Sequence, residues 1–146
     1  MCRNIVVGTD CSPTSERAVG QAADLARRLG AVLHVVSAYL PTAGERMAAG
    51  RGPGVPRPAW AEQAMDDRHE QVRATVARLR TEGVDAHAHV GHGDPTAFLL
   101  ESAGVLDADL IIVGDRGLKG LRRMAGSVPN SLAHRATIDV LVIQTT

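Results

Sequence analysis

Short apolar runs alternate with helical segments along most of this chain. The runs at 5–8 and 110–113 are continuous, which is typical of strands that are covered on both faces, and the stretch at 31–39 is largely apolar and rich in β-forming residues. A further run at 140–143 predicts the last strand. Strand and helix therefore follow each other in turn from one end of the chain to the other, and this order predicts an α/β fold.

Residues that start and stop helices stand between these runs. Ser12 and Pro13 are suited to be an N-cap and a first helical residue, and Gly30 is a typical glycine after a helix end. Between them, apolar residues recur at helical spacing. Three more helices are expected: a long one that has Met65, Val72, Val76 and Leu79 on one face and ends at Gly83, one from Asp94-Pro95 onward, and one over 127–136.

Residues 84–90 have a different period from the other strand candidates. Their apolar side chains alternate with Asp85, His87 and His89, so one face of this strand should meet water. We therefore expect it at an edge of the sheet. Histidines on alternate strand residues share a face and could be imagined as metal ligands together with His92, but exposed edge histidines are more common, and we assign no metal site to protein residues alone.

The whole pattern predicts an open, five-stranded parallel sheet with helices on both faces. We expect one domain over 1–146, because this length suits a single core, with a long mobile loop at 41–58, where glycine and proline are dense. Ligands of such sheets bind beyond the carboxyl ends of the strands, where the strand order reverses. The strand ends at 8–10 and 113–115 are the candidates here.

Composition excludes several classes of protein. Sixteen basic and 16 acidic residues give no net charge, so no broad surface for nucleic acid or an anionic membrane is expected. Aromatic residues make up only 2% of the chain, which leaves little for stacking on single-stranded nucleic acid. We see no signal peptide and no membrane span, and expect a cytoplasmic protein in which Cys2 and Cys11 are reduced.

Glycines cluster in the connection between the fourth strand and the last helix. Gly114 and Gly117 follow the strand directly, and Gly126 and Ser127 precede the helix. Glycine lets a phosphate approach the backbone, and a helix N-terminus offers unpaired N–H groups, so this connection is a candidate phosphate cradle. Ser127 could give its hydroxyl to a phosphate oxygen or to a divalent ion held by phosphates, or it could only cap the helix.

Four basic residues lie in the same connection. They are Arg116, Lys119, Arg122 and Arg123. Their position favours contact with phosphate, and the alternative is a solvated basic face. Known motifs of other nucleotide and hydrolase sites are missing from the sequence: there is no G-x-x-x-x-G-K-[ST], no complete G-x-G-x-x-G and no nucleophile elbow.

Three stretches together resemble the universal stress protein family: IVVGTDCSPTSERA near the start, GHGDP in the middle, and DLIIVGDRG with GSVPNSLAHRATIDVLVI near the end. The resemblance implies a Rossmann-like sheet with strand order 3-2-1-4-5. It also implies an adenine nucleotide, with ATP favoured, bound by a G-x2-G-x9-G-[ST] motif at the ends of strands 1 and 4. This chain departs from the motif by one residue, because eight residues separate Gly117 from Gly126.

The family motif places residues around the nucleotide. Asp10 would lie near adenine and ribose, Ala38 would give a backbone contact to adenine, and Val128 a backbone N–H to phosphate. The candidate contacts are Thr9, Asp10, Ala38, Gly114, Arg116, Gly117, Gly126, Ser127 and Val128. Magnesium or manganese could accompany the phosphates.

We therefore expect a stress-response regulatory protein that binds ATP. No candidate base with a partner stands at the phosphate end, so rapid catalysis is not expected and slow ATP hydrolysis is left open. The alternatives are a member that binds cyclic AMP and a nucleotide-free structural dimer. We expect a homodimer through strand 140–143, because an apolar edge strand tends to associate and family members commonly pair there.

Overall fold

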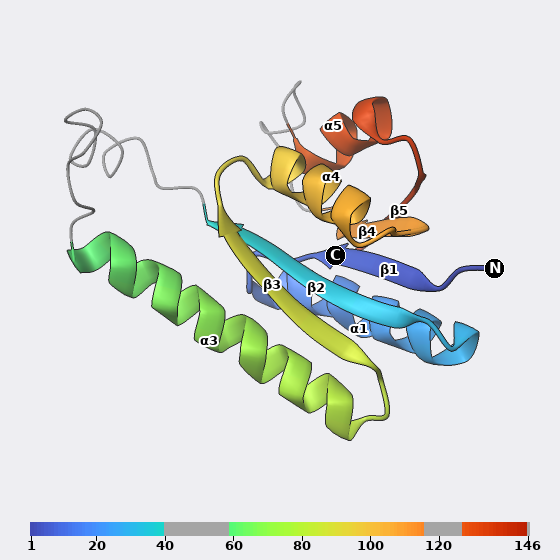
Figure 1. The fold of residues 1–146 in the computed structure, drawn as a ribbon, viewed down its shortest axis with the longest axis horizontal. Coiled ribbons are helices and arrows are strands. Elements are labelled where there is room, and N and C mark those ends of the chain that lie inside the picture. The colour runs from blue at the N-terminus through green and yellow to red at the C-terminus, as the bar shows by residue number, and fades with distance from the viewer. Residues whose placement is uncertain (40–58, 116–126, 146) are drawn as a thin grey trace.

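The computed structural model describes residues 1–39, 59–115 and 127–145. Five parallel strands form one sheet in the order β3-β2-β1-β4-β5, which confirms the predicted fold class and strand order (Figure 1). The glycine- and proline-rich segment predicted to be a loop, 41–58, lies outside the described residues.

The sheet is centred on the first strand. The strands are β1 (Asn4–Gly8), β2 (Val32–Tyr39), β3 (Ala86–His92), β4 (Leu110–Gly114) and β5 (Asp139–Ile143). Val7 is in register with Val35 of β2 on one side and with Ile112 of β4 on the other. The chain thus builds outward from β1 to β3, returns to the other side of β1, and builds outward again to β5. This reversal between β1 and β4 opens a crevice at the carboxyl ends of the strands.

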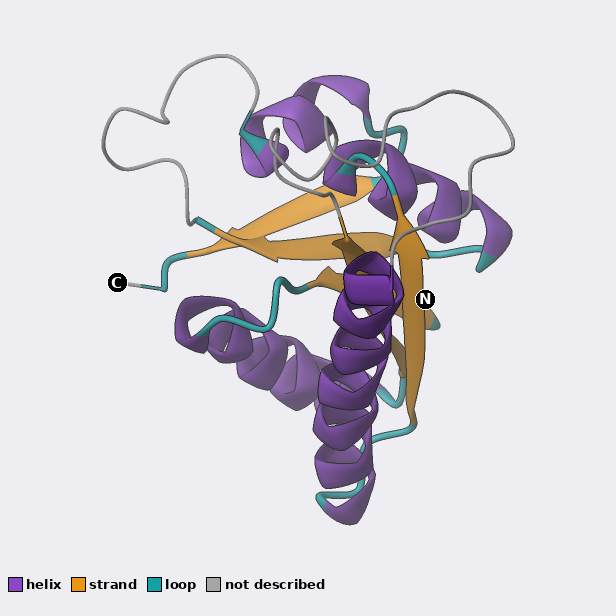
Figure 2. Cartoon of the chain, turned by 90° about the vertical axis from the view of Figure 1, so that its left-hand side faces the viewer, coloured by secondary structure: helices purple, strands orange, loops and turns teal. Residues whose placement is uncertain are grey.

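Within the described residues, helices cover both faces of the sheet (Figures 1 and 2). They are α1 (Pro13–Leu29), α3 (Ala59–Thr81), α4 (Pro95–Val105) and α5 (Val128–Arg135). The apolar faces of α1 and α3 pack with Val7, Val35 and Ile112 in one buried cluster. On the opposite face, α4 and α5 pack with Val6 and Ile111 in a second cluster. Alternate residues of the same strands therefore supply two cores, as continuous apolar runs predict.

The predicted caps place three helix starts at the carboxyl ends of the strands. Ser12 accepts a hydrogen bond from Ser15 N at 3.2 Å, Asp94 from Ala97 N at 2.9 Å, and Ser127 from Asn130 N at 3.4 Å. A proline stands in the first turn of each of these helices. Short-range signals in the sequence thus determine where α1, α4 and α5 begin, and with them the rim of the crevice.

The two edges of the sheet differ. On β3, which is an edge strand as predicted, Arg80 Nε donates a hydrogen bond of 2.8 Å to the carbonyl of Ala86. The neighbouring Asp85 carbonyl bonds β2, so the Ala86 carbonyl faces outward. On β5, at the other edge, Leu141 and Val142 are 38% and 37% exposed. Within the described residues β5 pairs only with β4.

Candidate functional site

A cavity of about 340 Å³ lies at the carboxyl ends of β1, β2 and β4. Its lining comes from these strand ends and from the first turns of α1, α4 and α5. The lining residues are Gly8, Thr9, Asp10, Ser15, Val36, Ala38, Pro95, Leu99, Val113, Gly114, Val128 and Pro129. The cavity therefore occupies the place where strand order reverses, which is where open α/β sheets bind ligands.

The structure brings most of the described candidate residues to this cavity. Thr9, Asp10, Ala38, Gly114 and Val128 line it. Ser127 caps α5, the helix whose first residue lines the cavity. The remaining three candidates, Arg116, Gly117 and Gly126, lie outside the described residues. The role of each residue toward a ligand stays a prediction.

Hydrogen bonds hold the turn between β1 and α1 in place. The hydroxyl groups of Thr9 and Ser15 lie 2.9 Å apart, and Cys11 N donates to Thr9 Oγ1 at 3.0 Å. Asp10 Oδ1 accepts from Ser12 N at 3.0 Å, while the side chain remains exposed at the cavity. The Asp10 carboxylate thus braces the turn, which is the simpler of its two possible roles, from a position that a ligand could also reach.

The cavity wall is mostly apolar, and at two glycines the strand backbone is closely approached by side chains of other segments. A Cβ on Gly8 would lie 3.1 Å from Leu99 Cδ1, and a Cβ on Gly114 would lie 3.1 Å from Thr145 Cγ2. Neither strand end can take a larger residue without moving the side chain that packs against it. An apolar wall with a few polar groups suits a flat aromatic ring with polar edges.

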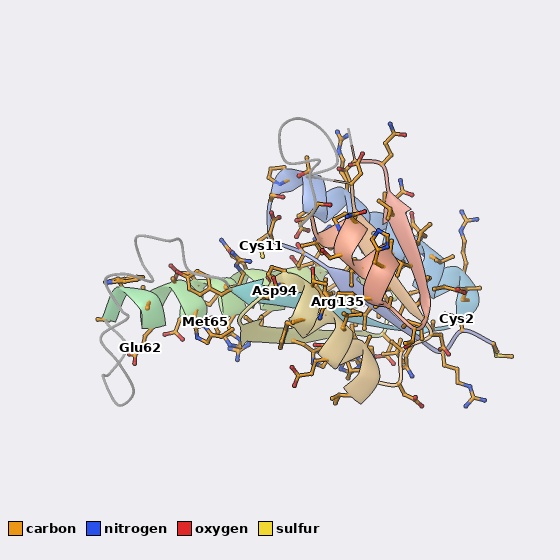
Figure 3. All side chains as sticks on the ribbon, turned by 90° about the horizontal axis from the view of Figure 1, so that it is seen from above. Cys2, Cys11, Glu62, Met65, Asp94 and Arg135 are labelled. Atoms are coloured by element: carbon orange, nitrogen blue, oxygen red, sulfur yellow. The ribbon has the colours of Figure 1, made fainter. Side chains whose placement is uncertain are left out.

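Helix N-termini supply the polarity of the rim. Ser15, Pro95 and Val128 come from the first turns of α1, α4 and α5, and all three line the cavity. The positive ends of three helix dipoles are therefore directed to one place, an arrangement that favours an anion. Figure 3 shows Cys11, which precedes the N-cap of α1, near Asp94, the N-cap of α4, and Cys2 well away from both.

The two cysteines are free, and their surroundings do not activate them. Burial raises the pKa of the Cys11 thiol above its ordinary value, although Arg68 acts in the opposite direction. Burial also raises the pKa of the Cys2 thiol. A raised pKa leaves less thiolate at neutral pH, so neither residue has the character of a nucleophile.

Neither a metal cluster nor a membrane helix is found in the described ranges. Over 1–39, 59–115 and 127–145, no three or more His, Cys, Asp or Glu side chains are grouped so as to hold a metal ion. No helix in the same ranges is long and apolar enough to cross a membrane.

A histidine group lies on β2 and β3, outside the lining of the cavity. His34 Nδ1 and His89 Nε2 are 3.0 Å apart, so one must donate to the other. The rings of His34 and His87 stack with their centroids 5.7 Å apart, and His87 is paired with Asp85 at 2.9 Å. His34 Nε2 also lies 3.4 Å from Asn4 Oδ1. The residue pattern predicted exposed edge histidines and gave no sign of the bond between His89 and His34.

Stability should depend on pH through this group. Burial lowers the pKa of both His34 and His89 below the ordinary value of 6.5, and the positive charge of protonated neighbours adds to the effect. Between these pKa values and 6.5, the folded chain binds fewer protons than the unfolded chain. The contribution of the two histidines to the free energy of unfolding is therefore fully present above pH 6.5, and it is lost as the pH falls through the folded pKa values. We expect the urea concentration at the unfolding midpoint to decrease when the pH is lowered from about 7.5 to about 5.5.

Replacing both histidines with glutamine should flatten this dependence. Glutamine is polar but does not titrate in this range. His134→Gln, at an exposed position of α5, is the matched control and should keep the wild-type dependence. An equal pH dependence in the double variant and the wild type would show that other groups cause it.

The fold and the cavity together define a class: an open parallel α/β sheet with an anion-favouring crevice at its point of reversal. The family model for the universal stress protein family matches residues 1–144. A universal stress protein of Mycobacterium tuberculosis is 35% identical over 149 residues, which cover 99% of this chain and 97% of the relative. The chain therefore belongs to the universal stress protein family.

Two solved structures extend the comparison. One is a universal stress protein in complex with cAMP, with a TM-score of 0.77 and 30% identity, covering 99% of this chain and 98% of that one. The other is a universal stress protein from Archaeoglobus fulgidus in complex with dAMP, with a TM-score of 0.68 and 25% identity, covering 97% and 98%.

Proposed function

We propose that this protein is a regulatory protein that binds an adenine nucleotide in the cavity at the ends of β1 and β4. One observation carries the proposal: Asp10 and Ala38 lie on the same cavity as Val128, at the start of α5. Groups suited to adenine and ribose thus stand beside a helix N-terminus suited to phosphate. The similar proteins in complex with cAMP and dAMP support an adenine ligand.

ATP is our favoured ligand and cyclic AMP is the alternative. The glycines and cations of 114–127 favour ATP, because a polyphosphate needs more donors than a single phosphate. The complex of the 30% identical neighbour favours cyclic AMP. In either case, Ser127 and the N–H of Val128 would face phosphate, and Ser127 could approach a magnesium or manganese ion held by an ATP polyphosphate.

The proposed role is regulatory, in a stress response of the cytoplasm, and slow hydrolysis of ATP is compatible with it. We also propose that two copies pair through β5. The exposed Leu141 and Val142 on an edge strand support this pairing, because apolar edges associate unless they are protected. A nucleotide-free dimer is the alternative if no ligand binds.

Nucleotide binding can be tested on the purified protein. Denaturing a native preparation should release an adenine nucleotide, which chromatography would identify. Titration calorimetry of the emptied protein with ATP, cyclic AMP and GTP should then give binding for one adenine ligand and much weaker binding for GTP. If neither adenine ligand binds at about 1 mM, a level at which even binding of only about −4 kcal/mol would be seen, the nucleotide-free dimer replaces our proposal.

Asp10→Ala should weaken binding of the adenine ligand by about tenfold or more, because a hydrogen bond to a charged group is lost. Asp10→Asn is the matched variant: it keeps an acceptor for Ser12 N but loses the charge. We expect Asp10→Asn to melt like the wild type and still bind more weakly. Unchanged affinity together with a lower melting temperature in Asp10→Ala would show that Asp10 stabilises the turn and does not contact the ligand.

A further inference from the structure

The chain after β5 returns to the end of β4. Thr145 donates two hydrogen bonds to Asp115 Oδ1, from its amide at 3.0 Å and from its hydroxyl at 2.7 Å. Asp115 N in turn donates to the carbonyl of Ile143 at 2.8 Å. Asp115 and Thr145 are only 8% and 3% exposed. This buried contact is separate from the residues that line the cavity.

The same threonine packs against the back of the cavity wall. A Cβ added to Gly114 would lie 3.1 Å from Cγ2 of Thr145 and 3.6 Å from Cβ of Ala18. On its other side, Arg17 Nη1 donates to the carbonyl of Thr145 at 3.1 Å. Thr145 is therefore fixed between α1 and the end of β4, two elements that both contribute to the cavity lining through Ser15 and Gly114.

A carboxylate is an expensive choice for a packing contact at this position. Burying a polar side chain is unfavourable unless hydrogen bonds compensate for it, and the two bonds from Thr145 supply that compensation here. Hydrogen bonds are directional, and those of Asp115 fix it at two points: its side chain accepts from Thr145, and its amide donates to the carbonyl of Ile143 at the end of β5. The main chain that forms the cavity wall is thereby held in one position.

We propose that Asp115 is a positioning residue for the adenine-nucleotide site, acting through Thr145. It holds the Gly114 main chain where the ligand meets the wall, through the two hydrogen bonds that its side chain accepts from Thr145. The inference rests on the proposed nucleotide binding and adds to it a residue that lies behind the site.

A pair of variants at Thr145 separates the hydrogen bond from the packing. Thr145→Val keeps the shape and the methyl contact with Gly114 but loses the hydroxyl, whereas Thr145→Ser keeps the hydroxyl. We expect Thr145→Val to bind ATP or cyclic AMP, whichever the wild type binds, about tenfold more weakly, equivalent to about 1.4 kcal/mol. Thr145→Ser and Gln144→Ala, at an exposed neighbour, should stay within about twofold of the wild type.

A double-variant cycle tests whether Asp115 acts through this contact. Asp115→Ala should also weaken binding, and adding Thr145→Val to it should change the affinity by less than about twofold, because both changes remove the same contact. Independent effects that multiply would overturn the inference. So would a Thr145→Val variant that melts at a lower temperature and binds like the wild type. If the wild type binds no adenine nucleotide, the proposed function and this inference both fail.

Discussion

Ala38→Phe is expected to weaken adenine-nucleotide binding by more than about a hundredfold, equivalent to about 2.7 kcal/mol, and to leave the fold intact. Ala38 lies near the end of β2 and lines the cavity. A phenyl ring at this position would occupy space within the 340 Å³ cavity that the ligand requires. Phenylalanine suits a strand and the residue is only half-buried, so the sheet should tolerate it.

Calorimetric titration and thermal melting of the same sample measure the two effects of Ala38→Phe. Ala74→Phe adds the same ring at an exposed position of α3, across the sheet from the α4 and α5 side, and should bind like the wild type. If Ala38→Phe melts like the wild type and its affinity falls by less than about tenfold, the ligand does not use the β2 side of the cavity.

Leu141→Asp should convert a dimer into a monomer. Leu141 is 38% exposed on the edge strand β5, where pairing with a second copy would cover it. A charge there must be buried without a partner if the strands pair, and charged residues on edge strands are a common protection against pairing. Light scattering at micromolar concentration should give twice the chain mass for the wild type and the chain mass for the variant.

The control makes the same replacement elsewhere. Leu29→Asp also exchanges an exposed leucine, 47% exposed at the end of α1, and should remain a dimer. Wild-type protein that scatters light as a monomer would contradict pairing through β5. A dimer that survives Leu141→Asp would place the interface on another surface.

The fold could be predicted because its signals are local. Ser12, Asp94 and Ser127 each bond an amide three residues further along, so a cap is visible in four consecutive residues. Strands buried on both faces give continuous apolar runs, and the edge strand β3 gives alternation. Helix α3 begins at Ala59, whereas the apolar face that predicted the helix is marked only from Met65 onward, because the first turns of the helix have no regular apolar face.

The long-range contacts could not be predicted in this way. His34 and His89 are 55 positions apart, and Asp115 and Thr145 are 30 apart. Only the register of the sheet brings each pair together, and neither residue of a pair is unusual in its own segment. The apolar lining residues Pro95 and Leu99 could not be predicted for a related reason: leucine and proline occur in a buried core as well as in a cavity wall, so the residue type does not distinguish the two.

The outward bond from Arg80 to Ala86 has a consequence for the size of the assembly. A sheet that offers both edges can add copies without limit and grow into a filament, whereas a sheet with one available edge is satisfied by a single pairing. Arg80 occupies one outward carbonyl at the β3 edge, so this edge offers one acceptor fewer to an added strand than an edge without such a contact.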